Sequence, residues 1–384
     1  MWDPKNSPAW RPSRRTLLAS AVAVPMLAAV RPADASTSKL LYVGTWRGTQ
    51  LNCARFDPDS GTMTPIGVVA QLNAGWHTKH PSKPVLYVAS GDPGGTVSAF
   101  RIDRATGALS LIGQVMTDSA GTPGGLSYIG IDRSSGTVLA ANFAAGLTAA
   151  LPIRKDGGLD APASIVVDIG SGPHPRQAGP HPHHVVVDPT GRFALVADFG
   201  ADRVFVYPFD RRTRVLSGDG MTSYATNPGS APRRLHFHPN GRTLYLLNEL
   251  TADLHVLDWN PRNGQITLDQ TLSTDSPEHT GTSSAAELGM SRDGRFLYAT
   301  NRGENTLVTF EADLGTGRLT LVQRIPCGGL SPWSFSIHRD NRWMLVANQV
   351  SSTVNLFSID QRSGQLTDTG TSMPVPNPDC ITLA

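Results

Sequence analysis

The chain has 384 residues, a length that suits either two ordinary domains or one large all-β domain. Charged residues make up only 17% of it, whereas 38 glycines and 29 prolines supply many turn positions, a balance typical of short strands joined by tight turns. A formal charge of only +2 without a basic patch argues against nucleic acid as a partner, and three scattered cysteines are too few for a disulfide framework.

The N-terminal segment has the pattern of an export signal. An apolar run over residues 17–30 follows a basic region and precedes Ala33-Asp34-Ala35, which is typical of a signal peptide cleaved after residue 35. The paired Arg14 and Arg15 directly before the run resemble a twin-arginine signal, with an ordinary secretory signal as the alternative. Both predict a periplasmic or secreted protein. No segment is long enough for a stable membrane anchor.

The mature chain, residues 36–384, is expected to form one domain. Removing the signal takes away five lysines or arginines and two aspartates, which leaves a formal charge of about −1. A short apolar motif that ends in a small or polar residue then recurs seven times, with successive copies starting 45, 52, 56, 50, 53 and 47 residues apart. The copies are residues 41–45, 86–90, 138–142, 194–198, 244–248, 297–301 and 344–348.

Each copy has further strand patterns around it. An apolar stretch that runs into a turn precedes most copies, as in residues 185–191, and an alternating stretch that closes in a polar turn follows, as in residues 56–61. With one more strand, each unit holds four antiparallel strands. Units of this size and content predict an all-β, seven-bladed β-propeller, a better fit than a linear solenoid or stacked sandwiches. Because the mature chain begins partway through a unit, we expect residues 373–383 to complete the first blade.

Strand register predicts which side chains meet at one mouth of the central channel. In an antiparallel blade the start of the first strand and the end of the second lie at the same edge. His183 and Arg233 stand six residues before the turn prolines Pro189 and Pro239. The same count in other blades gives Gly75, Ser127, Ala286 and Trp333. The ends of the second strands add Asp198, Asn248 with Glu249, Asn301 with Arg302, and Asn348.

The predicted catalytic set at this mouth is His183, Arg233, Glu249 and Arg302. A titratable histidine and glutamate beside two fixed cations suit an anionic substrate and a proton transfer. The alternative is that Arg233 and Glu249 form only an inter-strand ion pair. The histidines of residues 181–184 could bind zinc, but no further cysteine or carboxylate stands at a usual metal spacing, so we expect neither a metal nor a cofactor. Further substrate-binding candidates are His181, Asp198, Asn248, Glu287, Asn301 and Trp333.

Several short motifs carry a family resemblance. They are Pro180-His181-Pro182-His183, Pro232-Arg233, Asn248-Glu249-Leu250, Ala286-Glu287-Leu288, Asp293-Gly294-Arg295-Phe296-Leu297-Tyr298, Asn301-Arg302-Gly303 and Val346-Ala347-Asn348-Gln349. In this order and spacing the chain resembles the lactonase family of seven-bladed propellers, which includes 6-phosphogluconolactonases and carboxymuconate lactonizing enzymes. The resemblance covers nearly all of the mature chain. It implies a site of one histidine, one glutamate and two arginines, which match His183, Glu249, Arg233 and Arg302.

The resemblance also implies an activity. It predicts hydrolysis of a sugar-type lactone by water, with His183 or Glu249 as general base and the arginines polarising the carbonyl. Trp333 stands where relatives often have an arginine, and Arg234 replaces a common histidine. Because export separates the protein from cytoplasmic sugar phosphates, a non-phosphorylated or carboxylated lactone is the expected small-molecule partner. The alternatives are a carboxymuconate-type lactonizing isomerase and a non-catalytic propeller that binds a ligand or protein, which Trp333 would suit.

Overall fold

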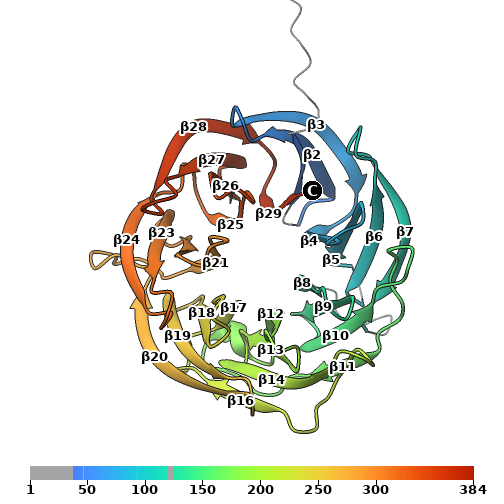
Figure 1. The fold of residues 1–384 in the computed structure, drawn as a ribbon, viewed down its shortest axis with the longest axis vertical. Helices are drawn as coiled ribbons and strands as arrows, with labels where there is room; N and C mark the ends of the chain where they lie inside the picture. The colour runs from blue at the N-terminus through green and yellow to red at the C-terminus, as the bar shows by residue number, and fades with distance from the viewer. Residues whose placement is uncertain (1–37, 46, 93, 119–124) are drawn as a thin grey trace, which may run out of the picture. The chain divides into compact units, whose positions relative to one another are not determined.

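The computed structural model describes residues 38–45, 47–92, 94–118 and 125–384, so the predicted signal peptide, residues 1–35, lies outside the described residues. Within them, seven antiparallel sheets are arranged as a ring around a central channel (Figure 1). The predicted seven-bladed propeller is therefore confirmed. The described part of the chain contains no helix with the length and apolarity that crossing a membrane requires.

The first three blades are given from the channel outwards. Blade 1 contains β29 (Pro378–Leu383), β1 (Lys39–Thr45), β2 (Gln50–Asp57) and β3 (Thr62–Gln71). Blade 2 contains β4 (Ala74–Lys79), β5 (Val85–Ser90), β6 (Thr96–Ile102) and β7 (Leu109–Met116). Blade 3 contains β8 (Leu126–Asp132), β9 (Thr137–Asn142), β10 (Leu147–Pro152) and β11 (Ser164–Val167).

The other four blades follow the same order. Blade 4 contains β12 (Pro182–Val187), β13 (Phe193–Asp198) and β14 (Arg203–Asp210), which pairs with both β15 (Val215–Leu216) and β16 (Thr222–Ala225). Blade 5 contains β17 (Pro232–Phe237), β18 (Thr243–Asn248), β19 (Asp253–Asn260) and β20 (Gln265–Ser273). Blade 6 contains β21 (Ala285–Met290), β22 (Phe296–Asn301), β23 (Thr306–Ala312) and β24 (Leu319–Pro326). Blade 7 contains β25 (Pro332–Ile337), β26 (Trp343–Asn348), β27 (Thr353–Ile359) and β28 (Leu366–Pro374).

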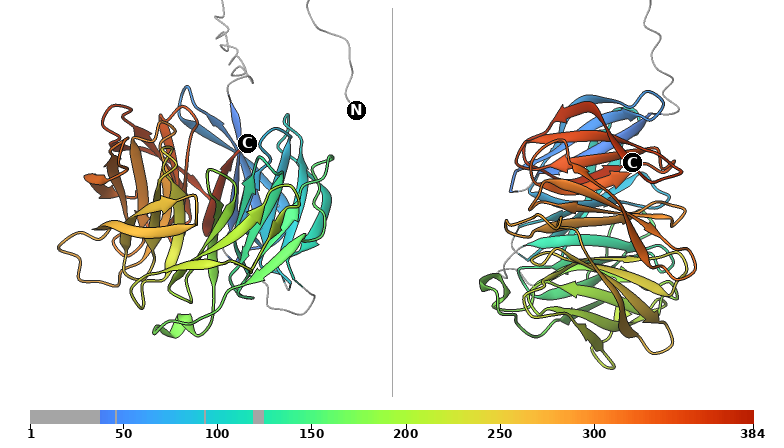
Figure 2. Two further views of the ribbon diagram at one scale, coloured as in Figure 1. Left: turned by 60° about the horizontal axis from the view of Figure 1, so that its bottom comes forward. Right: turned by 90° about the vertical axis from the view of Figure 1, so that its left-hand side faces the viewer.

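The ring closes where the two ends of the propeller meet. Strand β29 pairs antiparallel with β1, so the C-terminal strand becomes the innermost strand of the first blade (Figures 1 and 2). This is the predicted closure, with the strand itself limited to Pro378–Leu383. A buried cluster that includes Leu41, Phe56, Leu345 and Leu356 then packs blade 1 against blade 7. Similar apolar clusters join the other neighbouring blades, because each sheet is too small to bury both of its faces alone.

Most innermost strands carry a β-bulge close to their first residue. The register of β12 against β13 shifts between Pro182 and His184, and that of β17 against β18 shifts between Pro232 and Arg234. The same shift occurs in β4, β8, β21 and β25. A bulge inserts one extra residue and re-aims its side chain. His183 and Arg233 are such extra residues, which explains why one register count found equivalent positions in successive blades.

Candidate active site

Glu249, which directly follows β18, is the centre of a charged cluster at the mouth where the innermost strands begin. Its carboxylate is only 2% exposed and receives three arginines. Oε2 accepts a hydrogen bond from Arg233 Nη1 at 2.8 Å, while Oε1 lies 2.8 Å from Arg176 Nη1 and 3.1 Å from Arg302 Nη2. Three guanidinium groups around one carboxylate leave the cluster with excess positive charge, which suits an anion or a carbonyl oxygen that gains negative charge.

These arginines decide the protonation of Glu249. Burial alone would raise the pKa of its carboxyl group, but the charges of Arg302, Arg233 and Arg176 outweigh burial and lower the pKa to about 2. Glu249 is therefore ionised at neutral pH, and both of its oxygens are engaged by arginines.

His183 contacts the same cluster through the bulge of β12. Its Nε2 faces Arg233 Nη1 in a close contact, and because a guanidinium can only donate, Nε2 is the acceptor. The proton of the neutral ring is then on Nδ1, which is buried and has no hydrogen-bond partner among the described residues. Burial, with Arg233 and Arg234 nearby, holds the pKa of His183 well below its ordinary value. His183 is therefore a neutral imidazole at physiological pH.

Aromatic rings border the cluster. The Trp333 ring lies under two of the guanidinium groups, with its centroid 4.5 Å from the Arg302 carbon and 5.5 Å from the Arg233 carbon. Across the mouth, Phe143 stacks on His181 at 4.4 Å and meets His183 edge-on at 5.7 Å. Flat rings beside charged groups suit a sugar-type ring, which presents both apolar C–H faces and hydroxyl groups.

Strand register did not predict Arg176. It belongs to the 3₁₀ helix η1 (Pro175–Gln177), in the long connection between β11 and β12. Gln177 fixes this helix by donating to the Phe199 carbonyl and to Asp202 Oδ1, both at 2.7 Å. Arg176 remains 53% exposed although it contacts Glu249. The unusual length of the connection was the one signal in the sequence that could have directed attention to it.

Three of the candidate substrate-binding residues lie outside the cluster. Asp198, Asn248 and Asn301 end second strands as expected, but all three are fully buried. Asp198 Oδ1 accepts from the backbone N–H groups of His181 and Ala201 at 2.9 and 2.7 Å. Asn301 Nδ2 donates to a neighbouring carboxylate at 2.6 Å, and Asn248 Nδ2 lies 3.5 Å from an imidazole nitrogen. In the structure these side chains therefore hydrogen-bond to neighbouring protein groups and stabilise the loops around the mouth.

Glu287, another candidate, directly follows Ala286, which is the position equivalent to His183 and Arg233. The Glu287 carboxylate contacts Arg234. Arg234 Nε is 2.9 Å from Glu287 Oε1, and the guanidinium stacks at 4.4 Å on Trp76 and at 5.2 Å on Tyr128. Arg234 comes from blade 5, whereas Trp76 and Tyr128 come from blades 2 and 3. The arginine therefore extends across the channel, and it is 1% exposed. We call Glu287, Arg234, Trp76 and Tyr128 the crossing layer.

Comparisons with known proteins agree with this architecture. A family described as "Lactonase, 7-bladed beta-propeller" matches residues 40–383. The 6-phosphogluconolactonase of Bacillus subtilis is 28% identical over 90% of this chain and 98% of its own length. The structure of a periplasmic gluconolactonase of Pseudomonas aeruginosa superposes with a TM-score of 0.83 at 32% identity, covering 90% of this chain and 99% of that one.

Proposed function

Because the chain belongs to the seven-bladed β-propeller lactonase family, we propose that it hydrolyses a sugar-type lactone without a phosphate group at the cluster of His183, Arg233, Glu249, Arg302 and Arg176. Membership, together with relatives named 6-phosphogluconolactonase and gluconolactonase, supports a lactone-hydrolysing enzyme similar to 6-phosphogluconolactonase. The observation that carries the assignment of the site is the convergence of three arginines on one buried carboxylate beside a neutral histidine.

The arginines supply the electrostatic part of the proposed reaction. A water molecule attacks the lactone carbonyl carbon, and the carbonyl oxygen becomes the oxyanion of a tetrahedral intermediate. Arg176 and Arg302 are the two arginines with exposed surface, at 53% and 10% of their side chains, so they are placed to bind this oxygen. The intermediate then breaks its bond to the ring oxygen, which takes up a proton and becomes the hydroxyl group of the open-chain acid.

We assign the general base to His183. Glu249 is a poor base, because its pKa is about 2 and its oxygens accept from arginines. The neutral imidazole of His183 takes the proton of the attacking water at Nε2, a step that requires Arg233 Nη1 to give up its contact with this nitrogen. It can then return this proton to the leaving ring oxygen. Glu249 holds the arginines in position.

The pH profile tests this assignment. The pKa of His183 lies well below its ordinary value, so the imidazole stays in its basic form as the pH falls through 6.5, the ordinary value. Glu249 stays ionised down to a pH of about 2. We therefore expect kcat/KM for a neutral lactone to be retained at about pH 6 and to fall only at more acidic values. An acid limb with an apparent pKa at or above the ordinary value of histidine would contradict the assignment.

Trp333 supports a substrate without phosphate. The family resemblance implies an arginine at this position, and here the indole ring instead lies against Arg302 and Arg233. The site thus has one cation fewer for a phosphate group and one more flat surface for a sugar ring. The similarity to a periplasmic gluconolactonase and the signal-like residues 1–35 support the further proposal that the protein is exported.

Changing Trp333 to arginine is expected to shift the substrate preference. The ratio of kcat/KM for 6-phosphogluconolactone to that for gluconolactone should rise about tenfold, which corresponds to roughly 1.4 kcal/mol from one added ion pair. Trp333→Phe is the matched control, since it keeps a ring without adding charge, and it should leave the ratio close to that of the wild type. If the wild-type enzyme itself prefers the phosphorylated lactone, the proposed substrate class is wrong.

A further inference from the structure

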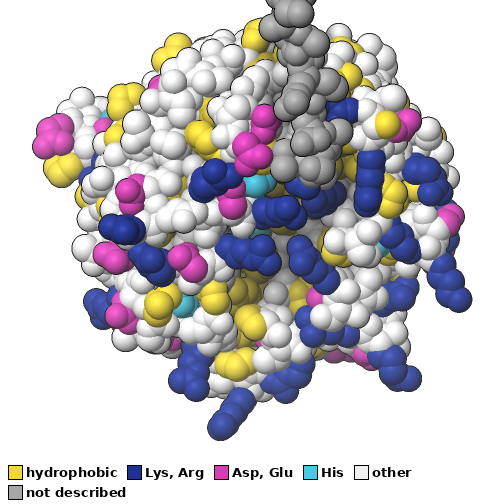
Figure 3. Space-filling view, turned by 45° about the horizontal axis from the view of Figure 1, so that its top comes forward, with side chains coloured by type: hydrophobic (Ala, Val, Ile, Leu, Met, Phe, Trp, Pro, Cys, Tyr) yellow, Lys and Arg dark blue, Asp and Glu magenta, His cyan; other side chains and the backbone are white. Residues whose placement is uncertain are grey.

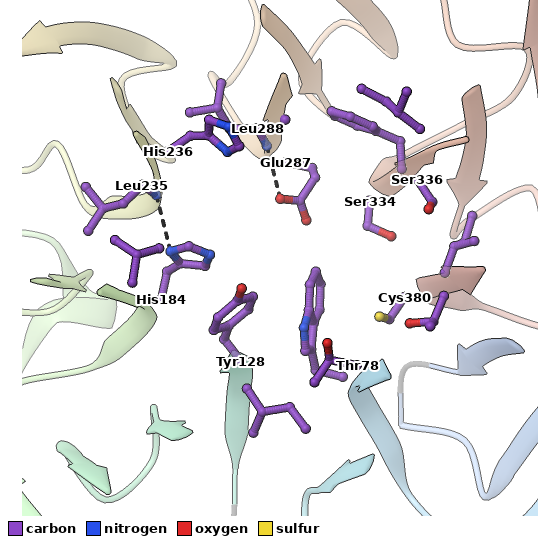
Figure 4. A pocket seen from close by; sticks show the side chains of 18 of the residues that line it. Thr78, Tyr128, His184, Leu235, His236, Glu287, Leu288, Ser334, Ser336 and Cys380 are labelled. Atoms are coloured by element: carbon purple, nitrogen blue, oxygen red, sulfur yellow. Dashed lines mark hydrogen bonds between the residues drawn. The ribbon is translucent and has the colours of Figure 1, made fainter. Parts of the chain in front are cut away.

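Beyond the crossing layer, the channel contains a cavity of about 640 Å³ that the proposed mechanism does not use. Its walls are the remaining parts of the seven innermost strands, and its lining includes Trp76, Tyr128, His184, Glu287, Ser334 and Ser336 (Figure 4). No catalytic residue proposed above lines this lower cavity. From Glu287 to Met290, the strand extends three residues, or about 10 Å along the channel. The volume is within the range of small-molecule sites.

The end of the lower cavity next to the crossing layer presents unsatisfied polar atoms. Glu287 is 7% exposed, and its Oε2 has no hydrogen-bond partner among the described residues, although Oε1 is paired with Arg234. Ser334 is 1% exposed, and its hydroxyl group likewise lacks a partner among them. In Figure 4 the Glu287 carboxylate points into the channel. A buried acceptor such as Glu287 Oε2 is stabilised by a hydrogen-bond donor from a ligand. An uncharged hydroxyl group suits this role, because Arg234 already balances the negative charge of Glu287.

The walls between the two ends carry no charged side chain and combine polar side chains with many apolar ones. Thr78 and Ser336 contribute hydroxyl groups, and His236 contributes an imidazole. The Thr382 hydroxyl is already bonded to His77. Burial lowers the pKa of His236 to about 4, so its ring is neutral at physiological pH. Such a wall can donate to and accept from several hydroxyl groups of one ligand, while the Trp76 ring offers a flat apolar surface.

The open end of the lower cavity is strongly basic. Lys79 ends β4 and Lys39 begins β1 at this mouth, and Arg133, Arg339 and Arg104 follow the ends of β8, β25 and β6 within two residues. We call these five residues the cationic rim. None of them forms an ion pair with another described residue. Figure 3 shows lysines and arginines gathered around the hollow of the channel. Cations without a carboxylate partner around a concave entrance attract an anionic group.

We propose that the lower cavity is a second binding site, distinct from the catalytic cluster, for a polyhydroxylated carboxylate of the sugar-acid class. Its hydroxyl groups would contact Glu287, Ser334 and the polar walls, and its carboxylate would lie at the cationic rim. A cationic ligand would be repelled by the rim, and a purely apolar ligand would leave Glu287 Oε2 and the Ser334 hydroxyl unsatisfied. The assignment goes beyond the proposed reaction and does not depend on it.

Titration calorimetry with D-gluconate tests the site. Ser336→Phe would fill the cavity from its wall, and Ser336→Ala is the matched control that leaves it open. We expect Ser336→Phe to weaken D-gluconate binding at this site at least about tenfold, whereas Ser336→Ala binds like the wild type. Lactone hydrolysis should persist in both variants, because neither touches the catalytic cluster. Equal D-gluconate affinity in wild type and Ser336→Phe would overturn the proposal.

The rim is tested separately with ligands that differ in charge. The wild type should bind D-gluconate about tenfold more tightly than uncharged D-glucose, and added salt should reduce the difference. Lys79→Gln removes one of the five charges and should reduce this preference. The Lys79 side chain lies at the surface, so the fold should be retained. Equal binding of the two ligands by the wild type would overturn the carboxylate assignment. Failure of the catalytic proposal would be seen instead as absent turnover with D-gluconate binding intact.

Discussion

Replacing His183 with alanine is expected to lower kcat/KM for a sugar lactone by about 10²- to 10⁴-fold, the usual contribution of a well-placed general base. His183 is the neutral group next to the arginine cluster that can accept a proton, whereas Glu249 is held by three guanidinium groups. The measurement is initial-rate kinetics with a purified variant whose thermal unfolding has been compared with that of the wild type.

His181→Ala is the matched control for His183. Both side chains contact Phe143, but His181 stacks on that ring and contacts the Phe143 carbonyl at 2.8 Å. No hydrogen bond or ion pair among the described residues joins His181 to the arginine cluster. We expect a much smaller loss of activity. Added imidazole should restore part of the activity of His183→Ala if the lost group is a base. Activity in His183→Ala similar to that of His181→Ala would remove His183 from the mechanism.

Replacing Glu249 with glutamine is expected to lower the free energy of unfolding by about 3–5 kcal/mol at neutral pH, because it leaves buried positive charge unbalanced. The pKa of Glu249 in the folded protein is about 2, below its ordinary value of 4.5, so this stabilisation is fully present above pH 4.5 and is lost as the pH falls toward 2. Denaturant unfolding of wild type and Glu249→Gln at several pH values should therefore show a difference that shrinks in acid.

Arg176→Gln provides the contrast. Arg176 contacts the same carboxylate but is 53% exposed, so its ion pair is screened by solvent. We expect little change in stability and a clear loss of kcat/KM, since its role lies in binding the substrate oxygen. A stability loss as large as that of Glu249→Gln would show that Arg176 serves the fold rather than the reaction.

The repeat pattern made the propeller predictable. Seven copies of one apolar motif at nearly constant spacing require seven equivalent units, and units of four short strands close into a ring. Register then predicted which side chains gather at one mouth of the channel, because antiparallel pairing places the starts of first strands beside the ends of second strands. The bulges at His183 and Arg233 repeat from blade to blade, so counting back from the turn found equivalent residues without the structure.

Interactions across the channel were not predictable in this way. Arg176 lies in an irregular connection whose path no strand register describes. Arg234 stacks on Trp76 and Tyr128 from the opposite side of the ring, and a repeat pattern carries no information on side chains that meet across the axis. Strand register predicted the positions of Asp198 and Asn301 at the strand ends correctly. It could not predict that both side chains bond to neighbouring protein groups, because this depends on the path of the adjacent loops.

The proposed lactone hydrolysis is tested most directly by turnover of aldonolactones by purified protein that lacks the predicted signal peptide, residues 1–35. Acid release is followed beside the Arg233→Ala variant. Arg233 joins His183 to Glu249 and is 2% exposed, so its loss should disrupt the cluster as a whole. We expect the wild type to hydrolyse at least one non-phosphorylated lactone, with turnover reduced at least about 100-fold in Arg233→Ala. Equal turnover by folded wild type and variant, or no turnover of any lactone by the folded wild type, would show that the cluster is not the site of this reaction.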